Sequence, residues 1–334
     1  MPYFPEKKPD PPGKEKQPEE EKQAEGMTEK QIKLFRLCLA VFSCLLIVWG
    51  AVRLIGYGAD LSASRQTSRE LQQLHEQEVP EEKTEAPAEP EPTGTQAPTD
   101  SPVPTDSPAP AETPRAAEDD PVLQPVTYPD NPGLKVSARF RQLRKKSGDI
   151  IGWLSMDGVE EAVALKDNSF FLDHDATGKK NTNGAIFLDA GIGLLTRPYT
   201  VILYGHNMKS GNMFGRLKKY LEYTYCAGHR TVSFDSLYEE GKYAVFAVAQ
   251  ISTEPGTATY YDLWALTSND RAYREKAIEK LKNRSVHPDM LDVQADEQIL
   301  LLVTCIDTDT DRLVVAARRL REGETEGKLD YKQK

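Results

Sequence analysis

The feature that most limits how this chain can fold is a proline- and acid-rich stretch in its first half. Residues 76–120 contain 13 Asp or Glu residues and only two basic residues, and 14 of the 23 prolines lie between Pro80 and Pro132. Because large apolar side chains are nearly absent there, ordering this stretch would cost more conformational entropy than burial could offset. We therefore expect residues 58–133 to form an extended, semi-rigid spacer.

The rest of the chain is almost electrically neutral. The formal net charge of -10 is accounted for by the acidic stretch alone, and no basic patch indicates nucleic-acid binding. Roughly 190 residues remain beyond the spacer, which is enough for one domain. We expect this domain to span residues 134–322 and to be followed by a polar tail over residues 323–334.

An apolar segment near the N-terminus has the composition of a membrane span. Leu37 to Val52 is free of charges, and extension to residue 57 reaches a sufficient length. Lys and Arg are more frequent before this segment than after it, which predicts a disordered cytoplasmic tail over residues 1–33, a transmembrane signal anchor over residues 34–57 and an extracellular remainder. A cleaved signal peptide is the alternative, since Ser62-Ala63-Ser64 offers small residues for cleavage.

The remaining residues are dominated by short strand-like runs separated by turn residues. Such runs begin near residues 152, 162, 184, 199, 231 and 242, and two more lie within LLVTCIDTDTDRLVVAARRL at residues 301–320. Helical patterns are expected at residues 134–147, 213–221 and after Ser268-Asn269-Asp270. Many short strands with few helices favour a mainly β fold with added helices, namely a closed β-barrel.

The cysteines are few enough to constrain the chemistry. Cys38 and Cys44 lie in the apolar segment, so only Cys226 and Cys305 belong to the predicted domain. Either these two form a disulfide or at least one is a working thiol. Cys305 ends a strand-like run, where a side chain is held rigidly yet open to a substrate, and a thiol nucleophile there needs a nearby acid or base.

Two histidines compete for that role. His206 follows an apolar strand and a glycine in VILYGHNM, which places its imidazole at a strand end. His229, in CAGHR, lies three residues from Cys226, so a local pair of these two is a competing site. The tyrosines beside Cys226 indicate a surface loop, and we favour His206.

The segment after Cys305 adds a guanidinium and an acidic turn. In a tight hairpin Arg312 would lie on the same rim as Cys305, where it could stabilise a thiolate or a developing oxyanion. Arg318 and Arg319 have the pattern of ordinary surface residues. An EF-hand starting at Asp307 would need Gly and Glu where Arg312 and Arg318 stand, so no metal site is predicted.

Taken in order, VILYGHNM, LLVTC and RLVVAARRL resemble a class B sortase over nearly all of residues 135–321. This resemblance implies a closed eight-stranded barrel with an N-terminal helix and a helix before the cysteine strand. It implies Cys305 as nucleophile, His206 as general acid/base and Arg312 as transition-state stabiliser, with no cofactor. By the same resemblance, residues of the substrate groove would be Thr304, Thr259, Tyr260 and Tyr261.

The resemblance implies a thiol peptidase-type acyltransferase at the outer face of the cell membrane. Such an enzyme cleaves a C-terminal sorting signal of a secreted protein and transfers the protein to an amine of peptidoglycan precursor or of a pilin. The alternatives from the residues are an anchored cysteine peptidase and a non-catalytic wall-binding module in which Cys226 and Cys305 form a disulfide. Papain-like peptidases place Cys before His, whereas here His206 precedes Cys305.

Overall fold

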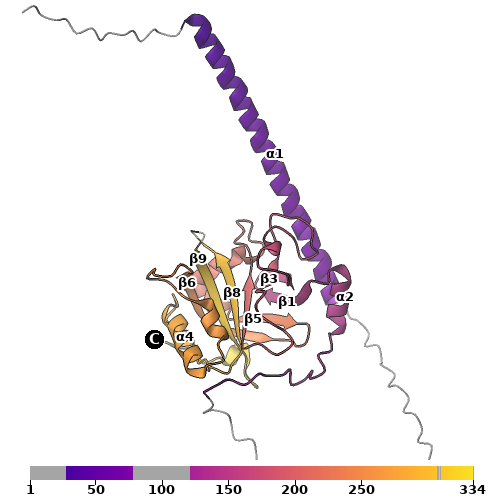
Figure 1. The fold of residues 1–334 in the computed structure, drawn as a ribbon, viewed down its shortest axis with the longest axis vertical. Helices are drawn as coiled ribbons and strands as arrows, with labels where there is room; N and C mark the ends of the chain where they lie inside the picture. The colour runs from indigo at the N-terminus through magenta and orange to yellow at the C-terminus, as the bar shows by residue number, and fades with distance from the viewer. Residues whose placement is uncertain (1–27, 78–120, 307, 309, 334) are drawn as a thin grey trace, which may run out of the picture. The chain divides into compact units, whose positions relative to one another are not determined.

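The computed structural model describes residues 28–77, 121–306, 308 and 310–333 (Figure 1). The chain divides between Gly56 and Tyr57 into two compact units, and the second contains every strand. Residues 1–27 of the predicted tail (1–33) and the acidic part of the spacer at residues 78–120 lie outside the described residues. Residues 29–33 are helical, so the prediction that they belong to a disordered tail is wrong.

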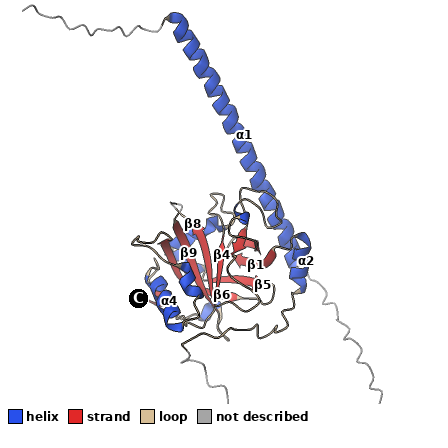
Figure 2. Cartoon of the chain, in the orientation of Figure 1, coloured by secondary structure: helices blue, strands red, loops and turns tan. Residues whose placement is uncertain are grey.

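Eight strands close into a barrel in the order β1-β2-β3-β4-β8-β9-β6-β5 (Figure 2). The pairs β2/β3 and β4/β8 are parallel, and the other neighbours are antiparallel. The strands are β1 (Ile150–Met156), β2 (Val159–Ala164), β3 (Ile186–Leu188), β4 (Thr200–Tyr204), β5 (Thr231–Ser236), β6 (Lys242–Ser252), β8 (Ile299–Cys305) and β9 (Asp311–Arg319). The closed eight-stranded barrel predicted from the sequence is confirmed.

The remaining elements connect or cover the barrel. The α-helices are α1 (Glu29–Glu76), α2 (Ala138–Lys146), α3 (Tyr223–Gly228) and α4 (Arg271–Asn283). Single 3₁₀ turns or runs are η1 (Phe170–Leu172), η2 (Phe214–Leu221), η3 (Leu263–Thr267) and η4 (Glu326–Lys328), and β7 (Asp289–Met290) pairs with β10 (Lys332–Gln333). The predicted helix over residues 213–221 is therefore a 3₁₀ run.

The central strands are buried on both faces, which explains their continuous apolar sequences. In β8, Leu300 and Leu302 belong to one hydrophobic cluster, whereas Leu301 and Val303 belong to a second cluster with residues of α4 and η3. The α4 helix begins where the sequence predicted, because the side chain of Asp270 accepts a hydrogen bond from the Tyr273 amide. The two-layer packing of β8 fixes the end of the strand that carries Cys305.

Residues 58–76 are helical, and the prediction that they belong to an extended spacer is wrong. They form the second half of α1, and Leu71, only 2% exposed, joins the hydrophobic cluster inside the second unit. Ser68 donates to the carboxylate of Glu161 at 2.8 and 2.9 Å, and Thr67 donates to Asp175 at 3.2 Å. The sequence does indicate this helix: Leu61, Ser64, Ser68 and Leu71 recur at a spacing of 3–4 residues, before the acidic stretch begins.

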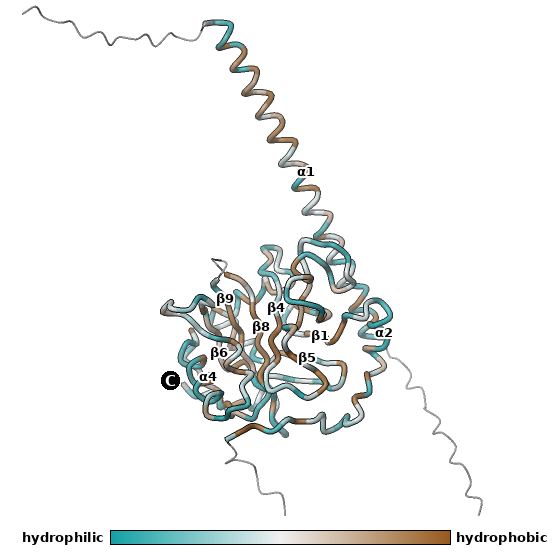
Figure 3. Tube along the Cα trace, viewed as in Figure 1, coloured by the Kyte–Doolittle hydropathy of each residue, from teal (hydrophilic) through white to brown (hydrophobic). Residues whose placement is uncertain are grey.

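Beyond its polar start at residues 29–33, the first half of α1 is mostly apolar (Figure 3). Its most apolar 18-residue window has a mean hydropathy of 2.3 and is not buried. Within the described residues, α1 is the one helix whose length and composition suit a membrane span.

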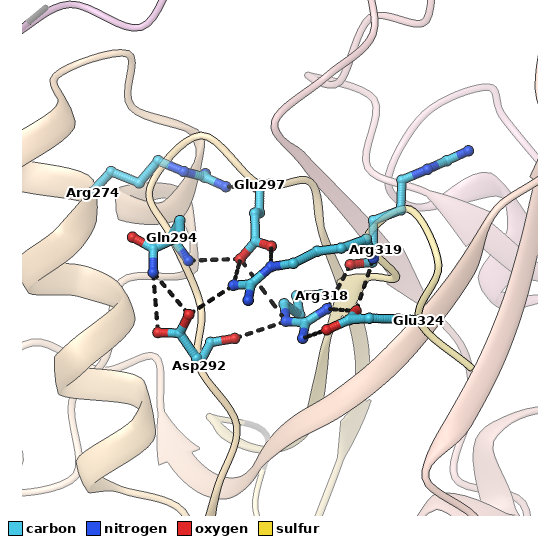
Figure 4. Close-up of polar contacts among 8 residues, drawn as sticks. Arg274, Asp292, Gln294, Glu297, Arg318, Arg319 and Glu324 are labelled. Atoms are coloured by element: carbon cyan, nitrogen blue, oxygen red, sulfur yellow. Dashed lines mark hydrogen bonds and ion pairs between the residues drawn. The ribbon is translucent and has the colours of Figure 1, made fainter. Parts of the chain in front are cut away.

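Arg318 is buried, so its interpretation as a surface residue is wrong. Its side chain is 1% exposed and forms two hydrogen bonds to the carboxylate of Glu324, at 2.7 and 2.8 Å, and a third to the carbonyl of Asp292 at 2.7 Å. Figure 4 shows this cluster beside Glu297. The Glu324 carboxylate compensates the positive charge of Arg318 inside the protein. Through its bond to Asp292, Arg318 also holds the segment before β8 against β9.

Candidate active site

One pocket of about 360 Å³ contains all three groups that the sequence pointed to. Cys305 ends β8 and lies directly opposite Arg312 on the antiparallel strand β9. His206 follows β4, which runs parallel to β8 on its other side. The pocket is lined by Asn168, Leu172, Phe187, Tyr204, Gly205, His206, Thr253, Leu263, Val303, Thr304, Cys305 and Arg312.

The Cys305 thiol is exposed and is not in a disulfide. It follows six buried residues of β8, so its backbone is fixed while its side chain faces the pocket. The side-chain amide of Asn207 donates to the Cys305 carbonyl at 2.8 Å, and the Thr304 hydroxyl donates to the Gly205 carbonyl at 2.7 Å. These two bonds tie the loop that carries His206 to the end of the cysteine strand.

The His206 ring is half-buried and held on one side. Its Nε2 lies 2.6 Å from the carbonyl oxygen of Leu172, and because a carbonyl only accepts, Nε2 carries the proton in this contact. In the neutral ring the other nitrogen, Nδ1, is then the acceptor. Gly205 is needed for space rather than for a sharp turn, because a Cβ there would lie 2.9 Å from the ring of Phe214.

The Arg312 guanidinium supplies the positive charge of the pocket. Its Nη1 donates to the Asp311 carbonyl at 2.9 Å. Its charge also acts on Tyr204: burial and the neighbouring Asp189 carboxylate raise the pKa of the Tyr204 phenol well above its usual value, and Arg312 opposes that rise. A thiol, an imidazole and a guanidinium in one partly apolar pocket form a set able to carry out acyl transfer.

Of the four predicted groove residues, only Thr304 lines the pocket. Tyr261 is 2% exposed and its hydroxyl donates to the Ala277 carbonyl at 2.8 Å, so it is a core residue and its assignment to the groove is wrong. Thr259 and Tyr260 are absent from the pocket lining, and Thr253 and Leu263 line it instead. Local sequence could not separate Thr253, Thr259, Tyr260, Tyr261 and Leu263, since all lie in the one connection between β6 and α4.

The competing Cys226–His229 pair is not in this pocket. Cys226 is buried in α3, which replaces the predicted surface loop. The His229 ring instead lies 2.8 Å from the Tyr225 carbonyl and 3.8 Å from Asp157. Neither Cys226 nor Cys305 is in a disulfide, so the alternative of a disulfide between them is also wrong.

The lining residues that the sequence analysis missed include Asn168, Leu172 and Tyr204, besides Thr253 and Leu263. Tyr204 carried a usable signal, because it lies two residues before His206 at the end of an apolar strand. Asn168 and Leu172 come from the loop around η1, whose approach to β4 is a long-range contact. Among the described residues, no group of His, Cys, Asp or Glu could hold a metal ion.

Comparison with known proteins identifies the family. The sortase domain model matches residues 161–320. Sortase B of Listeria monocytogenes is 31% identical over 180 residues, covering 53% of this chain and 70% of that protein, and Sortase B of Staphylococcus aureus is 28% identical over 194 residues, covering 56% and 76%. The crystal structure of sortase B from B. anthracis in complex with AAEK1 aligns with a TM-score of 0.50 at 30% identity, covering 56% of this chain and 86% of that one. The chain therefore belongs to the sortase family of cysteine transpeptidases, and its relatives are sortases of class B.

Proposed function

We propose that this chain is a membrane-anchored transpeptidase that cleaves a C-terminal sorting signal of secreted proteins and transfers them to an amine. The observation that carries the proposal is the single pocket shared by Cys305, His206 and Arg312, which come from three neighbouring strands or strand ends. Family membership supports the reaction class, and the pocket supports the assignment of roles.

In the first step the Cys305 thiolate attacks a backbone carbonyl of the sorting signal. The Arg312 guanidinium stabilises the negative charge that develops on the carbonyl oxygen, and His206 donates a proton to the leaving amine. The peptide C–N bond breaks, and the acyl group remains on Cys305 as a thioester. This step needs a deprotonated Cys305 and a protonated His206 at the same time. A thiolate–imidazolium pair of these two residues meets both needs.

In the second step an amine replaces the first leaving group. Its nitrogen attacks the thioester carbonyl, His206 accepts the amine proton, and the Cys305 thiolate departs. Water competes with the amine, so the apolar lining from Leu172, Phe187, Leu263 and Val303 favours transfer by limiting access of water. We propose an amine of peptidoglycan precursor or of a pilin as the acceptor.

The first half of α1 supports attachment to a membrane. Its apolar length suits a single span, and the Lys and Arg residues that precede it favour a cytoplasmic N-terminus by the positive-inside rule. On this proposal the barrel lies outside the cell, where secreted substrates emerge.

The proposal is tested with the full chain in detergent micelles, a library of extended peptides and a soluble diamine as acceptor. We expect mass spectrometry to detect peptides shortened at one bond and joined to the diamine. The matched Cys305→Ala variant should give neither product. Shortened peptides without any diamine adduct would instead indicate a peptidase, and no cleavage across the library would contradict the proposal.

A further inference from the structure

A turn behind the pocket fixes the orientation of two of its polar groups. It consists of Asp189, Ala190 and Gly191, directly after β3. Asp189 is 1% exposed, and its backbone amide donates to the Ile202 carbonyl of β4 at 2.9 Å. The buried carboxylate is thereby held at the edge of the barrel, although it does not line the pocket.

The Asp189 carboxylate accepts two hydrogen bonds. One comes from the Gly191 amide to Oδ1 at 2.9 Å, and the other comes from the Tyr204 hydroxyl to Oδ2 at 3.0 Å. A carboxylate can only accept, so the single hydroxyl proton of Tyr204 points to Asp189 and away from the pocket. The raised pKa of Tyr204 agrees, because it keeps that proton on the phenol. The Tyr204 oxygen can therefore only accept a hydrogen bond from a group in the pocket.

The same turn orients Asn168. The amide of Ala190 donates to the side chain of Asn168 at 2.8 Å, and since a backbone N–H only donates, the accepting atom must be the Asn168 oxygen. Its NH₂ group remains as the donor. Gly191 in turn lies beneath the ring of Trp264, where a Cβ would come within 2.3 Å of the indole. The turn therefore contacts two lining residues, Asn168 and Tyr204, and also Trp264, which follows the lining residue Leu263 in sequence.

We propose that Asp189 is a positioning residue that makes Tyr204 a hydrogen-bond acceptor, and that this acceptor, together with the Asn168 NH₂ donor, binds an amide group of the substrate peptide. An amide offers the matching N–H and C=O. A carboxylate in the same place would set an oxygen against the Tyr204 oxygen with no proton between them. The inference rests on the proposed transpeptidase function and adds a source of its substrate selectivity.

The amide could belong to the peptide backbone or to a carboxamide side chain, and the test separates these sources. The best peptide from the library is resynthesised with each backbone N–H methylated in turn, and with each Asn or Gln changed to Asp or Glu. Full-chain enzyme in micelles is assayed for kcat and KM as wild type, as Tyr204→Phe and as Asp189→Asn. Matched controls are Tyr273→Phe and Asp330→Asn, both on exposed side chains.

We expect Tyr204→Phe and Asp189→Asn each to lower kcat/KM about tenfold, mainly through KM, as for loss of one hydrogen bond. The double variant should lose no more than either single variant, because both act through one oxygen. One of the changed peptides should lower kcat/KM of the wild-type enzyme about tenfold and should leave kcat/KM of Tyr204→Phe unchanged. If that peptide carries a methylated backbone N–H, the bound group is a backbone amide. If it carries an acidic replacement, the bound group is a side-chain carboxamide.

Three results would overturn the inference while leaving the proposed function intact: full activity of Tyr204→Phe, additive losses in the double variant, or no peptide change whose effect vanishes in Tyr204→Phe. Alkylation of Cys305 at the wild-type rate confirms that a variant is folded. If the Asp189→Asn variant is unfolded, the inference is tested by the Tyr204→Phe variant and the peptide series without it. Inactive wild type with every peptide contradicts the proposed function instead.

Discussion

Replacing Leu71 by Ala tests whether the second half of α1 is part of the catalytic unit. Leu71 is 2% exposed and belongs to the hydrophobic cluster that contains Trp153 and Leu143. Removing a buried Leu side chain costs about 2–5 kcal/mol. Because Leu71 lies on a helix at the surface of the barrel, which can shift to fill the gap, we expect the lower part of that range, about 2–3 kcal/mol.

For a unit of this size, that loss of unfolding free energy lowers Tm by about 4–12 °C. The assay is thermal unfolding of the full chain in micelles, followed by near-UV circular dichroism, at one protein concentration. Gln73→Ala is the matched control, since Gln73 is exposed on the same stretch of helix and should shift Tm by less than about 2 °C. Equal Tm values for wild type and Leu71→Ala would refute the packing of residues 58–76 against the barrel.

Three further predictions concern the pocket, the helix contact and the second thiol. His206→Ala and Arg312→Ala should each lower kcat/KM of peptide transfer at least about 100-fold with unchanged Tm; near-normal turnover would remove the role assigned to that residue. Burial raises the pKa of Glu161 from 4.5 to about 7, so the folded chain keeps a proton that the unfolded chain loses. The free energy of unfolding should therefore fall as pH rises from about 4.5 to 7, by at most about 3 kcal/mol, and urea titrations of Glu161→Gln should show a flatter profile; an identical profile would contradict this origin. Cys226→Ala should keep transfer activity while losing about 1 kcal/mol of stability in urea titration, and loss of activity in a folded variant would reopen the Cys226–His229 alternative.

The strands and the chemical groups could be predicted from the sequence because their signals are local. Each strand of the barrel coincides with an apolar run, and α4 begins at Asp270, the expected capping residue. Cys305 and Arg312 lie on one short hairpin, so their pairing followed from turn geometry alone. His206 required a further step, since its approach to Cys305 depends on the parallel pairing of β4 with β8.

The errors arose where contacts outside the residue's own helix or strand decide its environment. Arg318 carries a charge that local sequence assigns to the surface, but Glu324 and the Asp292 carbonyl satisfy it inside the protein. Residues 58–76 were merged with the acidic stretch, although their apolar side chains contact β1 and α2. Asp189 was visible as the acid that ends GAIFLD, yet only the fold shows that its carboxylate contacts Tyr204.

The central claim is that Cys305 forms a covalent bond to the substrate with help from His206. The most direct measurement is the intact mass of the full chain after rapid acid quenching with the best library peptide, followed by peptide mapping. We predict an added mass equal to the N-terminal part of the peptide, located on Cys305, and no such adduct in His206→Ala at the same time point. An adduct on Cys226, or turnover without any adduct on Cys305, would contradict the account.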